Sequence, residues 1–176
     1  MPVDDNLVQR TDAKLRYAEL HISELKSYSD LGQLDDWERA HLESVLFHLA
    51  GAFDAFLNEF NQGYTLELKD RDVDVNHIRK EVKAKNINSP AWTQLDSLLK
   101  DKGSWLSEML ELRHQGTHRR GIRRLVQIDA KHPSDKNVRL GRPNADEFME
   151  QDQLGSLKDY SGRLRTLIQD LRTLIG

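Results

Sequence analysis

The chain has 176 residues, enough for one domain, and its hydrophobic residues, 38% of the total, are clustered rather than diluted. It has no cysteine, which excludes disulfides, thiolate metal sites and cysteine nucleophiles. The net charge of −3 predicts no partner, and no apolar run approaches the roughly 20 residues that span a bilayer. The first residues also lack the pattern of a secretory signal. We therefore expect a single domain, residues 1–176, that is cytoplasmic and makes no membrane contact.

Two amphipathic helices are expected first. Apolar residues recur at helical spacing over residues 11–31, where Thr11 is a plausible N-cap. The second helix, from residue 35 or 36 to 61, has the strongest pattern, and Gly63 should stop it. Its apolar side chains step by four and three residues: Leu42, Leu46, Leu49, Phe53, Phe56 and Phe60. These two helices should supply much of the core.

The middle of the chain predicts shorter helices. Residues 64–89 are ambiguous, with a weakly apolar helix expected through Val75, Ile78 and Val82. Ser89-Pro90 is a good helix start, because serine caps free amides and proline fits the first helical position. A break is expected at Gly103-Ser104, after which residues 105–112 carry a further helix into a basic segment.

The last third combines an irregular insert with a final helix. Residues 121–143 lose helical periodicity and predict a short hairpin or an ordered loop. Residues 144–147, Asn-Ala-Asp-Glu, resemble a capping box, from which a helix should run to the C-terminus, with a possible interruption near Gly155. Its heptad stripe is Leu157, Tyr160, Leu164, Leu167, Leu171 and Leu174. The whole pattern predicts an all-α fold, an antiparallel bundle of four to five helices.

Charge is unevenly distributed along the chain. Residues 1–60 hold five basic and twelve acidic side chains, whereas residues 113–143 hold nine basic and two acidic ones. A short positive segment on an otherwise negative protein predicts a localised anion site.

Arg113 stands out within this segment. It follows Leu106 by seven residues and Leu110 by three, so it extends the apolar stripe of its helix and should point inward. A guanidinium there is costly unless it meets an anion or a carboxylate. Gly116 is expected to end the helix, so spacing alone does not fix the direction of His118.

The residue types of the segment suit RNA chemistry. Arginine matches phosphate oxygens, histidine moves protons near neutral pH, and RNA carries its own nucleophile in the 2′-hydroxyl. Such a site needs no cofactor and no metal. The arginines expected to hold the RNA backbone are Arg119, Arg120, Arg123 and Arg124. A simpler interpretation stays open, since arginines after a helix end commonly satisfy its last carbonyls or form a solvated or partner-binding surface.

The six residues from Arg113 to His118, Arg-His-Gln-Gly-Thr-His, are similar to the signature of the HEPN superfamily. That signature is an arginine, then asparagine, histidine or aspartate, then a short spacer and a histidine, late in a helix of a small all-α bundle. Arg113, His114 and His118 match it position by position. The expected order of helices around the motif also resembles the superfamily.

The resemblance implies a function and a site. Active HEPN proteins are typically metal-independent endoribonucleases of toxin–antitoxin, abortive-infection and CRISPR systems, and they work as homodimers. It implies that Arg113 binds the scissile phosphate, that His118 is the general acid/base and that His114 assists. An antitoxin or another regulatory protein is then a candidate partner beside RNA. Toxins of this kind that are silenced by nucleotide transfer carry a tyrosine where this chain has Arg120, which puts that mode of control in doubt. Some members only bind RNA, nucleotides or proteins, and this is the alternative function.

A metal-binding bundle is a further alternative. Glu111, His114 and His118 are spaced three and four residues apart, so a continuous helix would place them on one face. His41 and His48 on the second helix could complete such a site. The neighbouring arginines would repel a cation, so we expect no metal.

Overall fold

The computed structural model describes the chain except residues 1–2, 30–35, 119–120, 129–135, 144 and 176, and gives the backbone alone at 27–29, 118, 128 and 136. The elements are α1 (Asp5–Ser29), α2 (Asp36–Gly63), a 3-10 helix (Asp70–Asp72), α3 (Val75–Ala84), α4 (Pro90–Lys100), α5 (Trp105–His118), β1 (Arg124–Ile128), β2 (Lys136–Leu140) and α6 (Gln153–Ile175). The chain is thus mostly helical, as predicted, with one small antiparallel sheet.

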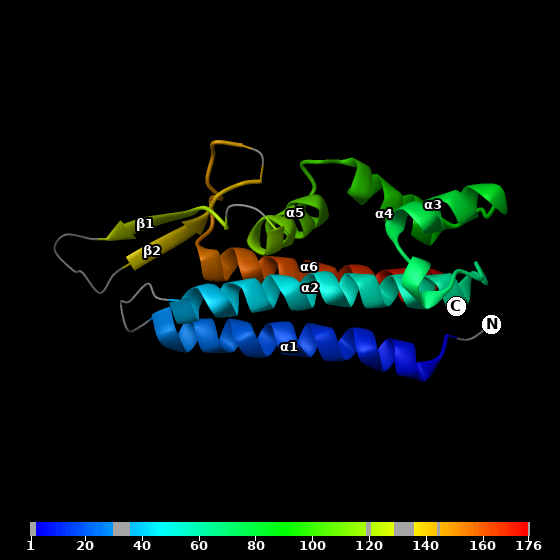
Figure 1. Cartoon of the computed structure of the whole chain (residues 1–176), viewed down its shortest axis with the longest axis horizontal. Coiled ribbons are helices and arrows are strands. Elements are labelled where there is room, and N and C mark those ends of the chain that lie inside the picture. The colour runs from blue at the N-terminus through cyan, green and yellow to red at the C-terminus, as the bar shows by residue number, and fades with distance from the viewer. Residues whose placement is uncertain (1–2, 30–35, 119–120, 129–135, 144, 176) are drawn as a thin grey trace.

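The three long helices α1, α2 and α6 lie side by side along the longest axis of the molecule (Figure 1). The shorter α3, α4 and α5 lie over one side of these helices. The hairpin of β1 and β2 lies at one end, and both chain termini lie at the other. Among the described residues, no helix is long and apolar enough to cross a membrane.

The core forms where the apolar stripes of these helices meet. The predicted stripe of α2 is almost completely buried, including Phe53, Phe56 and Phe60, whereas Phe47 on another side of the helix is exposed. The heptad expected in the last helix is buried from Leu157 to Leu171, whereas Leu174 is exposed near the end of the chain. Each stripe stabilises the fold because its apolar surface leaves water, at roughly 25 cal/mol per Å² buried.

An ionic network also joins the three long helices. Arg172 of α6 donates hydrogen bonds from Nε and Nη2 to the two carboxylate oxygens of Glu59 on α2, at 2.8 and 2.9 Å. Its Nη1 reaches Asp12 of α1 at 3.0 Å. The Glu59 side chain is only 1% exposed, so this fork neutralises a carboxylate inside the bundle.

Several helix starts and ends differ from the prediction. α1 begins six residues before Thr11, whose hydroxyl bonds to the carbonyl of Leu7 inside the helix instead of capping it. α2 ends at Gly63, the predicted stop, two residues later than expected. The start expected at residues 144–147 is wrong, although Asn144 itself lies outside the described part. α6 begins at residue 153, uninterrupted at Gly155, whose amide bonds to the Asp152 carboxylate. The predicted start at Ser89-Pro90 is confirmed, since Ser89 caps α4 through the amide of residue 92 at 3.0 Å.

The insert is a hairpin, one of the two predicted forms. β1 and β2 pair antiparallel, with Val126 opposite Val138. After β2 the chain folds back, so that Gly141 forms a bridge with Phe148. Leu140 and Met149 are buried in the main core, which fixes the base of the hairpin to the helices.

Candidate functional site

The predicted motif lies on the last two turns of α5. The expectation that Gly116 ends this helix is wrong, because the helix runs through it to residue 118. A Cβ at this glycine would lie 3.4 Å from Ile122 and 3.7 Å from Glu43 of α2. Gly116 is therefore not a helix end. It is a position inside α5 where Ile122 and Glu43 of α2 pack against the helix.

Arg113 lies on the side of α5 that faces the bundle, as its spacing predicts. The residue is partly buried, and its buried Nε has no hydrogen-bond partner among the described residues. The positive charge of Arg113 acts on the carboxylate of Asp54 of α2. Desolvation raises the pKa of this carboxyl although the residue as a whole is exposed, and the Arg113 guanidinium partly offsets that rise. Arg113 thus keeps hydrogen-bonding capacity that the described protein does not use.

The two motif histidines are one turn apart on a continuous helix. His114 is partly buried, whereas the side chain of His118 lies outside the described part. Successive helix residues are separated by about 100° around the axis, so Arg113 and His114 leave the helix in different directions. The hydroxyl of Thr117 caps this end by donating to the carbonyl of Arg113 at 3.0 Å. The backbone of the motif is therefore helical throughout, and Arg113 and His114 start from different sides of the helix.

The arginines expected to hold RNA have other partners where they are described. Arg123 donates to the carbonyls of Arg142 and Ala145 and lies 3.5 Å from the carboxylate of Asp146. The side chain of Arg124 is almost fully buried and pairs with Glu38 of α2. Arg119 and Arg120 lie outside the described residues. Arg123 thus holds the segment after β2, and Arg124 holds the hairpin to α2, so neither guanidinium is left without a partner in the protein.

A buried polar cluster that the sequence did not predict lies at the base of the hairpin. Arg124 of β1 pairs with Glu38 of α2 at 2.8 Å, and the two side chains are 8% and 7% exposed. Gln153, the first residue of α6, donates to the same carboxylate at 3.2 Å. Three separate segments meet here, and only their contact in the fold reveals it. The cluster positions the hairpin and leaves Arg124 no surface for RNA.

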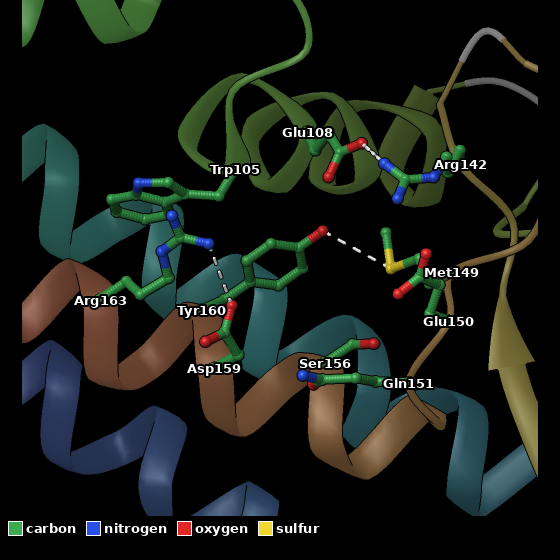
Figure 2. Close-up of a pocket in the computed structure, with 10 residues that line it drawn as sticks. All are labelled: Trp105, Glu108, Arg142, Met149, Glu150, Gln151, Ser156, Asp159, Tyr160 and Arg163. Carbon is green, nitrogen blue, oxygen red and sulfur yellow. Dashed lines mark hydrogen bonds and ion pairs between the residues drawn. The ribbon is translucent and has the colours of Figure 1, made fainter.

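A hollow of about 180 Å³ opens between α5, α6 and the segment before α6 (Figure 2). Two ion pairs dominate it. Arg142 meets Glu108 of α5 at 2.5 Å, and Arg163 of α6 lies over the Trp105 ring and 3.4 Å from Asp159. Of the motif side chains that the structure describes, Arg113 and His114 do not line the hollow. Its charges are largely neutralised within the protein.

Tyr160 lies in the wall of this hollow and points toward Met149, whose sulfur accepts its hydroxyl at 3.6 Å (Figure 2). Burial raises the pKa of this phenol strongly, Glu108 adds to the rise, and Arg142 opposes it. The hydroxyl is therefore protonated at neutral pH and can donate a hydrogen bond, but it is no base for catalysis.

His41 and His48, which were considered for a metal site with the histidines of α5, lie instead beside His21 of α1. Nδ1 of His41 lies 3.0 Å from Nδ1 of His21 on α1, and the His48 ring stacks on the His21 ring with centroids 5.5 Å apart. Within the described ranges, no three histidine, aspartate or glutamate side chains are arranged around a metal position.

The protein is thus a mostly helical bundle whose β1–β2 hairpin is attached at one end through Arg124 and Glu38. Residues 5–175 match the model of a protein family of unknown function, DUF6586, and the chain belongs to that family. No curated protein and no solved structure matches it.

Proposed function

We propose that this chain is a HEPN-like endoribonuclease that cleaves RNA without a metal at the C-terminal end of α5. In this proposal α1, α2, α5 and α6 form the antiparallel four-helix bundle of that superfamily. The observation that carries the proposal is the pairing of Arg113, whose buried Nε has no partner among the described residues, with two histidines on the ordered turns that follow. An unused guanidinium beside titratable imidazoles is the donor set that a phosphodiester requires.

The proposed reaction uses the RNA itself as the nucleophile. One imidazole takes the proton of the 2′-hydroxyl, whose oxygen attacks the adjacent phosphorus. Arg113 stabilises the charge on the phosphorane oxygens. The bond to the 5′-oxygen then breaks, and a second, protonated imidazole gives that oxygen a proton. The products are a 2′,3′-cyclic phosphate and a 5′-hydroxyl, and His118 and His114 are the two imidazoles.

A homodimer follows from the divergence of Arg113 and His114 around the helix. The two side chains leave α5 about 100° apart, so in this proposal a second copy completes the site. Two copies facing each other at α5 would supply the arginine from one chain and the acid/base from the other. A regulatory protein such as an antitoxin would act by covering this composite cleft.

The proposal is tested with a labelled RNA of mixed sequence in EDTA. We expect cleavage by the wild-type chain and at least about a hundredfold less by His118→Ala and by Arg113→Ala. His77→Asn is the matched control, because His77 lies on α3 and pairs with Asp74 at 2.8 Å, outside the motif. Equal activity in all four proteins would assign the cleavage to a contaminant.

A second candidate is a non-catalytic module that binds RNA or an acidic partner at the same place. The observation that favours it is the commitment of Arg123 and Arg124 to carbonyls and carboxylates of the protein, which leaves less free basic surface for a substrate. This candidate predicts RNA binding that weakens with salt and yields no cleavage product. The affinity should fall only gently with salt concentration, because few phosphates are contacted. A folded protein that binds RNA in this manner and never cleaves it would replace the first proposal.

A further inference from the structure

A cluster of aromatic and histidine side chains covers the surface where α1 meets α2. His21 of α1 lies between His41 and His48 of α2, at ring-centroid distances of 4.9 and 5.5 Å. Trp37 lies against His41 at 3.8 Å, and Tyr17 against His48 at 5.4 Å. The proposed ribonuclease does not use this cluster.

We propose that His21 and His41 bind a divalent transition metal ion, such as Zn²⁺ or Ni²⁺, between α1 and α2. Their Nδ1 atoms are 3.0 Å apart. Two imidazoles on one tetrahedral zinc, with Zn–N of about 2.0–2.1 Å, place their nitrogens about 3.4 Å apart. The two rings therefore need to separate by only a few tenths of an ångström.

The chemistry of the pair suits such an ion. Without metal, one Nδ1–H donates to the other Nδ1, so the pair holds one hydrogen between two nitrogens. Metal binding moves that hydrogen to Nε2 of the same ring and frees both Nδ1 lone pairs, so no proton needs to be released.

The surroundings distinguish this pair from His48. Glu24, one turn beyond His21 on α1, raises the pKa of His21 and thus supplies negative charge beside the metal position. Lys14 lowers the pKa of His48, so positive charge lies at that end of the cluster. The ring of His21 stacks on His48, and the ring of His41 lies against Trp37. Both ligands are thus held by packing before the ion arrives.

The remaining ligands are open positions for water or for the Glu24 carboxylate. No third histidine, aspartate or glutamate is in place beside the pair among the described residues, so the affinity expected from two protein ligands is moderate. The inference is independent of the proposed ribonuclease, whose site is on α5 and uses no metal.

Isothermal titration of the tag-free chain with ZnCl₂ at pH 7.5 tests the inference. We expect one Zn²⁺ per chain, binding weakened more than about tenfold in both His21→Asn and His41→Asn, and weakened less in Glu24→Gln. His77→Asn is the matched control and should bind like the wild type. Full binding by either His21→Asn or His41→Asn, or an equal loss in His77→Asn, would overturn the assignment and place the bound zinc at scattered surface groups.

A second readout guards against variants that fail to fold. Zn²⁺ that binds the folded chain raises the Tm of the wild type, and EDTA reverses the rise. A wild-type Tm that does not rise at any Zn²⁺ concentration would also overturn the inference. RNA cleavage in EDTA should be the same in His21→Asn as in the wild type, so a failure of this inference and a failure of the proposed ribonuclease are distinguishable.

Discussion

Replacing Arg172 tests how much the ionic network among the long helices contributes to stability. Arg172→Met keeps most of the side-chain volume of α6 but removes both hydrogen bonds to Glu59 and the contact with Asp12. The carboxylate that remains on α2 is 1% exposed and loses its guanidinium partner. The substitution therefore leaves a charge inside the bundle, and does more than delete a surface contact.

The magnitude follows from that burial. Breaking a buried ion pair by removing one partner costs about 3–5 kcal/mol. The Arg172 side chain is 24% exposed, so water reaches part of the network and we expect the lower end, about 3 kcal/mol. Arg172→Met with Glu59→Leu removes both charges, and the double variant should be more stable than the single one.

Urea unfolding followed by circular dichroism measures these differences. Arg165→Met is the matched control, because Arg165 also lies on α6 and pairs with Glu19 of α1 at 2.6 Å, but both side chains are substantially exposed. A surface pair of this kind is worth about 0–1 kcal/mol. Equal effects of the Arg172 and Arg165 substitutions, or a double variant less stable than Arg172→Met, would refute the reasoning.

Three further predictions concern local features. Gly116→Ala should stabilise the chain by up to about 1 kcal/mol in the same urea assay, because α5 is helical there and the added Cβ has ordinary room; destabilisation would show that the site is tighter. Ser89→Ala should lower the free energy of unfolding by about 1 kcal/mol, because it removes the cap on the amide of Trp92. An unchanged free energy of unfolding would show that this hydrogen bond contributes little to stability. The pKa values of His21 and His48 are lowered in the fold, chiefly by burial. Protons therefore bind the unfolded chain more readily, and stability in EDTA should fall as pH drops below about 6.5. His48→Asn should reduce this slope, and an unchanged slope would contradict the assignment.

Periodic features of this chain could be predicted from sequence, because they depend on neighbours within one helix. The stripe of α2 and the cap at Ser89 are of this kind, and both are present in the structure. The inward direction of Arg113 also followed from its spacing to two leucines. These inferences need only the helical repeat and local hydrogen bonding.

Features that depend on distant segments could not be predicted. Gly116 has the sequence of a helix stop, but α5 continues past it to residue 118, where Ile122 and Glu43 of α2 pack nearby. Arg124 belongs to a basic run that suggests an exposed surface, yet its partner Glu38 lies 86 positions earlier in the chain. His41 was matched with motif histidines, whereas it contacts His21 across the interface of α1 and α2. In each case the deciding neighbour is brought close only by the fold.

The central claim is that the end of α5 cleaves RNA through its own 2′-hydroxyl, with Arg113 binding the phosphate. The most direct measurement compares a labelled RNA with the same sequence carrying 2′-O-methyl groups, both in EDTA. We predict cleavage of the unmodified RNA alone, with 2′,3′-cyclic phosphate ends that disappear in Arg113→Ala. Cleavage of both substrates, or undiminished cleavage by Arg113→Ala, would contradict the claim.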